Sequence, residues 1–580
     1  MSPGPGRPGL TRTLRKWGPF SALMAAVVLL GVLVVVDDPA PAASPGREPG
    51  RPAEGVDADR IGAPAPVGRM PPTHAEASEA GTASDYDWGG TCDTDRGTVE
   101  LPSVRAAPCV PAFEGDNGGA TYPGVTGEAV RIVWYDASEA GGLDSLLSSA
   151  GLSDTPEQQF ETILDWVELL SSVSETYGRE VEVVRYVASG GLDDAVAAQS
   201  DAERIASEIE PFAVLGGPPS DGGAFAGELA RNGIICLAAR SACPSACSTS
   251  ALQLGDRTGH LPVRGGAHRL DDAGEDNAGL EGTAEFAGDA ELRSSQRRFG
   301  VVHFDQDPPV MTSCPDSRGW PEDFTVETYL LDFATMPRVG SEIMAKMKAA
   351  GVTTVIFAGD PLMPVYLTSA AEAIDYRPEW IFTGTVLTDT NAFGRMYDQA
   401  QMAHAFGVSQ TGVPVAPEAG GALNLYRWYF GADSYPPARA SYEVLLANLP
   451  RLFTGIQLAG PDLTPETFER PVPGAPSGGD PVSPQQSNGH WGFFENTDYN
   501  GTDDLAEIWW DVDAEGPDET GREGRGMWRY ARGGAGSPPT SRPIRPPSNA
   551  RGTVTRFEEL PPELAPPDYP PPPGSPAASQ

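Results

Sequence analysis

The chain has 580 residues, and its 80 acidic side chains outnumber the 40 basic ones, which gives a formal charge of −40. This charge excludes a nucleic-acid-binding protein, because such a protein needs a basic surface against the phosphate backbone. The 68 glycines and 58 prolines concentrate toward the two ends of the chain. We therefore expect about 400 folded residues, enough for one two-lobed body with sizeable cores.

The N-terminal residues 1–36 predict export. Four basic residues precede an apolar run over 17–36, which is long enough to span a bilayer. Ala40-Pro41-Ala42 is a candidate cleavage site, so the segment is predicted to be either a cleaved signal peptide or a retained membrane anchor. Basic residues before the run keep that end in the cytoplasm. The rest of the chain is then extracytoplasmic, secreted or anchored to the cell membrane by this N-terminal helix.

All six cysteines lie on the exported side, where an even number predicts disulfides. Cys92 and Cys109 bracket a short segment and are the predicted pair. Two further bonds are expected among the other four, in a pairing that the sequence leaves open: Cys236, Cys243, Cys247 and Cys314.

Composition divides the remaining chain into three parts. Residues 37–85 are rich in proline, alanine, glycine and charge, and predict a disordered tether. Residues 531–580 predict a proline-rich, disordered tail with a preference for the polyproline II conformation. The body is expected over 86–530. Within it, residues 255–280 lack apolar periodicity and are either a loop or a locally shifted reading frame.

The body alternates predicted strands and helices, first over a lobe at about 126–255. The predicted strands are 130–135, 181–186, 212–215 and 234–237, and the helices begin near 155, 194 and 221. The pattern restarts in a second lobe at about 283–440, and the rest of the body crosses back. Here the strands are 299–304, 325–331, 353–357 and 380–382, and the helices are 341–350, 364–373 and 438–453. The fold class is α/β, with two Rossmann-like lobes and a parallel sheet in each.

Small and polar residues follow the predicted strands, at the ends where open parallel sheets bind ligands. In the first lobe these candidates are Ser138, Gly217, Ser220, Ala239 and Ser241, and in the second Phe304, Asp305, Asp360 and Gly384. The helix start after Gly216-Gly217-Pro218-Pro219-Ser220 offers free N–H groups for a carboxylate. The alternative is that Ser220 or Asp221 only caps that helix.

Catalytic signatures are missing from the sequence in any supporting context. It contains no H-E-x-x-H, G-x-S-x-G, G-x-x-x-x-G-K or S-x-x-K, and its one G-x-G-x-x-G, at 4–9, follows no strand. We therefore expect a protein that is not an enzyme and needs no cofactor.

The sequence resembles the type I periplasmic-binding-protein fold, and within it the extracytoplasmic solute-binding proteins of branched-chain-amino-acid-type ABC importers. The resemblance covers roughly 126–530, and it rests on four features. These are the exported N-terminus, the repeated lobes, Gly217-Pro218-Pro219-Ser220, and the segments FGVVHFDQDPP (299–309) and LTPETFER (463–470). It implies two lobes that close about a hinge on a small solute and deliver it to an ABC permease in the membrane.

The same resemblance implies roles for individual residues. Ser220 would bind the carboxylate of the ligand, and Ala239 and Ser241 would line the loop after the fourth strand. An acidic partner for a ligand ammonium is matched by either Asp305 or Asp360.

A segment near the end of the body is similar to a calcium-binding loop. Its candidate ligands are Asp498, Asn500, Asp504 and Glu507. The first position is asparagine, and a predicted strand follows where the calcium-binding motif has a helix, so a solvated acidic loop is preferred and no metal site is assigned. Aromatic residues between 491 and 530 are expected to pack this segment onto the body, with a sugar-binding platform as the alternative.

The sequence thus predicts an extracytoplasmic solute-binding protein with a small-molecule ligand. A secreted or anchored hydrolase on a similar scaffold, and a ligand sensor with the same fold, are the two alternatives.

Overall fold

The structure is a computed structural model. It describes residues 70–103, 106–137, 154–191, 194–218, 223–237, 282–304, 324–384, 387–409, 413–469, 506–531, 553–560 and 565–579. The chain divides into two units, Met1–Ala65 and Pro66–Gln580. The predicted apolar run over 17–36 and the segment 255–280 lie outside the described residues. Within the described ranges no helix combines the length and apolar character needed to cross a membrane.

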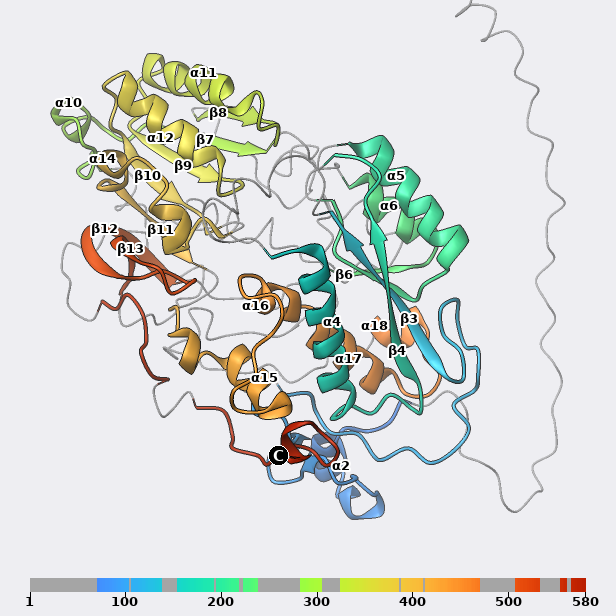
Figure 1. Cartoon of the computed structure of the whole chain (residues 1–580). Coiled ribbons are helices and arrows are strands. Elements are labelled where there is room, and N and C mark those ends of the chain that lie inside the picture. The colour runs from blue at the N-terminus through green and yellow to red at the C-terminus, as the bar shows by residue number, and fades with distance from the viewer. Residues whose placement is uncertain are drawn as a thin grey trace, which may run out of the picture. The chain divides into compact units, whose positions relative to one another are not determined.

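The first sheet has four parallel strands in the order β4-β3-β5-β6. The strands are β3 (Ala129–Asp136), β4 (Glu180–Val187), β5 (Ala213–Leu215) and β6 (Ile235–Leu237). They alternate with α4 (Pro156–Ser171), α5 (Ala195–Arg204) and α6 (Ala224–Arg231). Figure 1 shows α4 on one side of this sheet, and α5 and α6 on the other.

Local sequence accounts for the start of α4. The Thr155 hydroxyl accepts a hydrogen bond from Gln158 N, and the Gln158 side chain accepts one from Thr155 N. This capping box satisfies two backbone donors, and Pro156 stands where its missing N–H costs nothing. The apolar stripe of the helix, which includes Trp166, then packs into the first core.

The second sheet has seven strands in the order β13-β12-β11-β10-β9-β7-β8. Five are parallel: β7 (Phe299–Phe304), β8 (Thr325–Tyr329), β9 (Thr354–Ala358), β10 (Glu379–Phe382) and β11 (Ala405–Ser409). The helices α11 (Met336–Ala349) and α12 (Met363–Ala373) connect strands of this sheet. The predicted α/β class with a parallel sheet in each of two lobes is confirmed.

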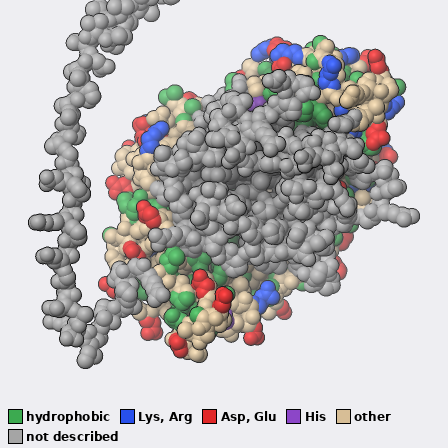
Figure 2. Space-filling view, turned by 180° about the vertical axis from the view of Figure 1, so that it is seen from behind, with side chains coloured by type: hydrophobic (Ala, Val, Ile, Leu, Met, Phe, Trp, Pro, Cys, Tyr) green, Lys and Arg blue, Asp and Glu red, His purple; other side chains and the backbone are tan. Residues whose placement is uncertain are grey.

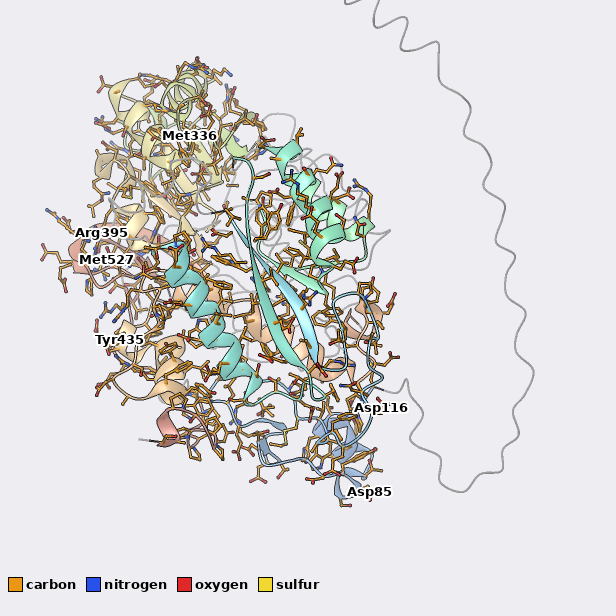
Figure 3. The ribbon with its side chains drawn as sticks, turned by 45° about the vertical axis from the view of Figure 1, so that its right-hand side comes forward. Asp85, Asp116, Met336, Arg395, Tyr435 and Met527 are labelled. Carbon is orange, nitrogen blue, oxygen red and sulfur yellow. A yellow bond between two sulfur atoms is a disulfide. The ribbon has the colours of Figure 1, made fainter. Side chains whose placement is uncertain are left out.

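A hairpin extends the second sheet beyond its parallel part. β12 (Ala506–Pro517) pairs antiparallel with β11 and with β13 (Glu523–Tyr530). Arg395 lies against this hairpin, near Met527 (Figure 3), and its guanidinium donates hydrogen bonds to the carbonyl oxygens of Gly516, Arg522, Gly524 and Gly526. Trp510, Trp528 and Tyr530 are buried in the second core. The alternative of a sugar-binding platform is therefore wrong for these three aromatics, because none of them is open to solvent.

The chain then returns to the first lobe through a series of helices. These are α15 (Gly421–Phe430), α16 (Tyr442–Leu446), α17 (Leu449–Ala459) and α18 (Pro465–Glu469). Buried residues from α15, α17 and α18 share one core with α4 and the first sheet. The predicted single helix over 438–453 is wrong, because a new helix begins at Leu449 with Pro450 in its first turn: proline has no N–H to donate and its ring collides with a preceding helical turn.

Segments at both ends of the described chain pack on this body. Before the first sheet, α2 (His74–Glu79) and the small ladder of β1 (Cys92–Asp93) and β2 (Thr98–Val99) surround the Cys92–Cys109 disulfide, which confirms the predicted pair. After the second sheet, residues 553–560 and 565–579 contact the body, ending in the short helix η8 (Ala577–Ser579). This differs from the disordered tail that the composition predicts, because the tail makes specific hydrogen bonds with both lobes.

Candidate functional site

The carboxyl edge of the first sheet carries a charged cluster. Asp136, at the end of β3, is 1% exposed and accepts hydrogen bonds from Arg185 Nε at 2.9 Å and Nη2 at 2.7 Å. Arg185 Nη1 lies 3.2 Å from Glu157 in the first turn of α4, and its guanidinium lies 5.8 Å from the centre of the Trp134 ring. A buried carboxylate such as that of Asp136 needs a positively charged partner, which Arg185 provides. The cluster thereby fixes β3, β4 and the start of α4 relative to one another, beside the predicted binding loops.

The helix α16 is attached to the same edge. The carboxylate of Asp154, just before α4, accepts hydrogen bonds from the backbone N–H groups of Arg439, Ala440 and Ser441. α16 follows at once and carries Glu443, whose side chain is exposed although desolvation by the surrounding protein raises its pKa. The place of α16 depends on the contact between Asp154 and residues 439–441, which no local pattern in the sequence shows.

The loop after β5 begins with a glycine pair. Gly216 has φ +80°, and a Cβ there would lie 3.3 Å from the carbonyl oxygen of Tyr135, so this position favours glycine. The predicted residue Gly217 comes next, at the carboxyl edge. α6 begins at Ala224 with Gly223 at its N-cap. Ser220 and Asp221 lie outside the described residues, so the alternative that one of them caps this helix stays a prediction.

In the second lobe, the predicted residue Asp360 follows β9 at the carboxyl edge and is 4% exposed. Its carboxylate accepts hydrogen bonds from the Tyr329 hydroxyl at 2.5 Å, Leu362 N at 2.7 Å and Met363 N at 3.0 Å. Burial raises the pKa of Asp360, and these hydrogen bonds oppose that rise. The side chain thus supports the turn into α12 and the end of β8.

A second polar group at this edge escaped the sequence reasoning. The Ser409 hydroxyl, at the end of β11, donates to Asp389 Oδ2 at 2.6 Å, and both side chains are buried. The predicted residue Gly384 lies beside them with φ +71°, and a Cβ there would lie 2.7 Å from the carbonyl oxygen of Val408. These residues come together only because β10 pairs with β11. Nothing in the sequence near any one of them indicates the contact.

The remaining predicted residues are either described only in part or lie outside the described residues. Phe304 ends β7 at the carboxyl edge, and nothing further is described of its side chain. The predicted candidates outside the described residues are Ser138, Ser220, Ala239, Ser241 and Asp305, together with Cys243, Cys247 and Cys314. Cys236 is buried in β6.

The calcium-loop candidates Asp498, Asn500 and Asp504 are also outside the described residues, whereas Glu507 lies in β12 opposite Val408. Among the residues that are described, no group of three or more histidine, cysteine, aspartate or glutamate side chains is placed to hold a metal ion. Figure 2 shows acidic side chains spread around the described rim of one face, with basic side chains among them.

The fold and its two carboxyl edges define a two-lobed α/β protein with Rossmann-like sheets. No family model and no curated protein matches the sequence. Among solved structures, the branched-chain amino acid transporter substrate-binding protein LivJ from Streptococcus pneumoniae is similar, with 12% identity over 70% of this chain and 100% of that one, at a TM-score of 0.40.

Two further structures resemble the chain to the same degree. The fatty acid ABC transporter substrate-binding protein from Thermomonospora curvata has 13% identity over 75% of this chain and 99% of that one, at a TM-score of 0.44. The leucine-binding protein LivK from Thermotoga maritima has 12% identity over 66% and 95%, at a TM-score of 0.41. Likeness at this level assigns neither a ligand nor a partner to the chain.

Proposed function

We propose that the chain is an extracytoplasmic protein that binds one small solute and delivers it to an ABC-type importer in the membrane. Its two lobes would close on the solute by a hinge motion, which is a common device for trapping small ligands. The N-terminal segment 1–36 would direct export, either cleaved or kept as an anchor.

One observation carries this proposal, namely that two separate parallel sheets each end in small and polar residues. Gly216 and Gly217 follow β5, and Thr383 and Gly384 follow β10. Open α/β sheets bind ligands at these ends, because helix N-termini and free loop backbone groups face the ligand there. The absence of catalytic signatures from the sequence supports binding rather than turnover.

Within this site, the residues assigned to the solute follow the two edges. Ser138, Gly217, Ser220, Ala239 and Ser241 would contact it from the first lobe, and Phe304, Asp305, Asp360 and Gly384 would line the second. Of the two acidic candidates, Asp305 is the better partner for a ligand ammonium, since the carboxylate of Asp360 already accepts three hydrogen bonds.

A thermal-shift screen of the exported protein against amino acids, amides, short-chain carboxylic acids and aromatic acids tests the proposal. We expect one class to raise the melting temperature in a concentration-dependent way, because a ligand of the native state stabilises it by mass action. The solute should be recovered unchanged by mass spectrometry. Conversion of the solute would overturn the proposal in favour of a hydrolase.

The first prediction concerns Ser220. If its hydroxyl and the neighbouring N–H groups bind a carboxylate, Ser220→Ala should weaken binding by about 10- to 150-fold, because a hydrogen bond to a charged group contributes about 1.5–3 kcal/mol. Isothermal titration calorimetry with the solute found in the screen measures this loss. Ser207→Ala, at an exposed position in the π-helical turn η2 (Ile205–Ile209) that follows α5, is the matched control and should leave the affinity unchanged. Equal affinity for Ser220→Ala and the parent protein would contradict the assignment.

A further inference from the structure

A cavity of about 170 Å³ lies beside the Cys92–Cys109 disulfide. Its wall is formed by residues from 88–112, by the turn at 172–175 and by Gln457 on α17. This turn leads from the C-terminal end of α4 toward the start of β4, so the cavity lies at the amino edge of the first sheet. The proposed solute site lies at the carboxyl edge, and the cavity is therefore a separate place on the molecule. A cavity of roughly 150 Å³ is large enough to hold benzene.

Hydrogen bonds from Gln457 hold the wall of this cavity together. Gln457 is 1% exposed, and its side-chain oxygen accepts a hydrogen bond from Glu175 N at 2.8 Å. Its side-chain amide donates to the carbonyl oxygen of Pro108 at 2.5 Å. These two bonds join α17 to the turn after α4 and to the segment that carries Cys109. A site that is fixed in this way loses little conformational entropy when it binds a ligand.

Glu175 is the one charged residue among the described residues that line the cavity. Its carboxylate accepts hydrogen bonds from Phe113 N at 3.1 Å and from Tyr177 N at 2.7 Å, which fix its orientation. Each carboxylate oxygen can accept a further hydrogen bond. Glu175 forms no ion pair in the described part of the chain. Its negative charge therefore stands in the wall without a counter-charge from the protein.

Trp88 and two hydroxyl groups complete the polar and aromatic part of the wall. The indole N–H of Trp88 already donates to the carbonyl oxygen of Ala83 at 2.8 Å, so the ring contributes an aromatic surface and no donor. Such a ring attracts a cation through its quadrupole. Within the described residues, the hydroxyl groups of Thr91 and Ser174 have no hydrogen-bond partner, and both can accept a hydrogen bond from a ligand.

We propose that this cavity binds a small organic cation, namely an ammonium group on an apolar body about as large as benzene. The ammonium group lies against the carboxylate of Glu175 and the hydroxyls of Thr91 and Ser174. The apolar body packs on the disulfide, on Trp88 and on the buried side chains of Val99, Val110 and Val173. An anion of the same size is repelled by Glu175, and a neutral molecule lacks the attraction between charges.

Benzylammonium, benzyl alcohol and benzoate test the proposal, because the three compounds share one ring and differ in charge. Saturation-transfer NMR titrations with the exported protein measure the dissociation constant of each. We expect benzylammonium to bind and benzyl alcohol to bind about tenfold more weakly, because hydrogen bonds between charged groups are roughly twice as strong as neutral ones. Benzoate should show no binding that depends on Glu175. The proposal is overturned if the three compounds bind equally or if benzylammonium does not bind.

Substitutions in the wall separate the contribution of charge from that of the ring. Glu175→Gln should reduce the affinity for benzylammonium to that for benzyl alcohol. Trp88→Leu should weaken the binding of benzylammonium by about 3- to 30-fold, the range of a cation–π contact. Glu128→Gln, on an exposed glutamate just before β3, is the matched control and should leave the affinity unchanged.

Ser174→Ala guards against a loss of binding that comes from misfolding. Its hydroxyl has no partner within the described chain, so the melting temperature should not change, while the affinity for benzylammonium should fall by about threefold. Unchanged affinity in both Glu175→Gln and Trp88→Leu would overturn the proposal.

Hydrogen exchange locates the bound cation. Benzylammonium should slow exchange within 88–92, 109–112 and 172–175, and it should leave α11 and α12 unchanged. Ser220→Ala should bind benzylammonium as the parent protein does, because Ser220 belongs to the proposed solute site. Protection that appears only outside these three segments, or loss of benzylammonium binding in Ser220→Ala, would overturn the assignment to the cavity.

Discussion

At the scale of single residues, buried polar side chains at the carboxyl edges hold the loops in place. Asp360 is the clearest case, since the sequence predicts it as a ligand-binding residue and the structure gives its carboxylate three donors within the protein. Its neighbour Tyr329 also accepts a hydrogen bond from Asp360 N, so the two residues lock β8 to the start of α12.

Removing the Tyr329 hydroxyl tests this role. Tyr329→Phe should lower the free energy of unfolding by about 1–3 kcal/mol, because a buried carboxylate loses a donor that water cannot replace. Chemical denaturation measures the loss, and Tyr366→Phe, on a half-buried tyrosine of α12, serves as the control with a smaller effect. An unchanged stability for Tyr329→Phe would show that Asp360 does not depend on this contact.

We expect His404 to make the stability of the second lobe depend on pH. Burial lowers its pKa, and the nearby Arg293 and Arg377 lower it further, while the carbonyl of Phe286 and Asp289 oppose the shift. The unfolded chain, with an ordinary histidine pKa of about 6.5, therefore binds a proton at a higher pH than the folded chain. Stability should fall as the pH decreases below about 6.5, because protonation favours the unfolded state.

Urea denaturation between pH 5 and pH 7.5 tests this pH dependence. His404→Gln keeps a donor for the Phe286 carbonyl but does not titrate, so its stability should change less steeply over the same range. If the free energy of unfolding changes with pH equally in the parent protein and in His404→Gln, the prediction is contradicted.

At the scale of elements, one buried ion pair holds the entry to the second lobe. Arg297 donates to both carboxylate oxygens of Glu379, at 2.9 Å and 3.0 Å, and the two side chains are 7% and 0% exposed. Thr354 and the backbone of Phe286 donate to the same carboxylate. The segment before β7 is thereby fixed to β9 and β10.

Breaking this pair from one side should be costly. Arg297→Met is expected to lower the free energy of unfolding by about 3–5 kcal/mol, because Glu379 is left as a buried, unpaired charge. The double variant Arg297→Met, Glu379→Gln should recover much of that loss, since the amide is neutral and still accepts hydrogen bonds. Equal losses in denaturation experiments on the two variants would show that the charge is not the cause.

The sequence predicted most elements of both sheets because their signals are local. Apolar runs such as 130–135 and 299–304 became β3 and β7, and the cap at Thr155 began α4. β11 was not predicted, because its five residues include Gly407 and become a strand only between β10 and β12. A Cβ at Gly407 would lie 1.9 Å from the carbonyl oxygen of Phe382, a close approach that sequence pattern does not show.

The candidate site was less predictable than the fold. Gly217 and Gly384 do lie at carboxyl edges, where the strand-end rule places them. The contact of Ser409 with Asp389, and the position of Glu443 on α16, depend on contacts between distant segments. No periodicity or motif in one sequence encodes such contacts.

At the scale of the whole molecule, the disulfide holds the segment before the first sheet. Cys109 is fully buried, the neighbouring Pro108 carbonyl accepts a hydrogen bond from Gln457 on α17, and Glu175 accepts one from Phe113 N. These contacts anchor residues 108–113 to the first lobe, and the bond extends that anchoring to Asp93.

Replacing both cysteines, Cys92→Ala with Cys109→Ala, should reduce stability by about 3 kcal/mol, the value that chain entropy gives for a loop of this length. Hydrogen exchange should become faster within 70–113 and at Tyr569, which donates to Asp93, while α11 and α12 should keep their protection. Faster exchange in α11 and α12 as well would contradict this local role.

The first core joins residues from Val99 to Phe468, whereas the second core lies largely between them in sequence, from Val302 to Tyr530. During synthesis at about 5–20 residues per second, strands β3 to β6 would wait on the order of tens of seconds for α15, α17 and α18. The apolar surface of β3 to β6 that these helices bury stays uncovered for that time. The first lobe can therefore complete its core only after residue 468 has been made, when most of the second lobe has already left the ribosome.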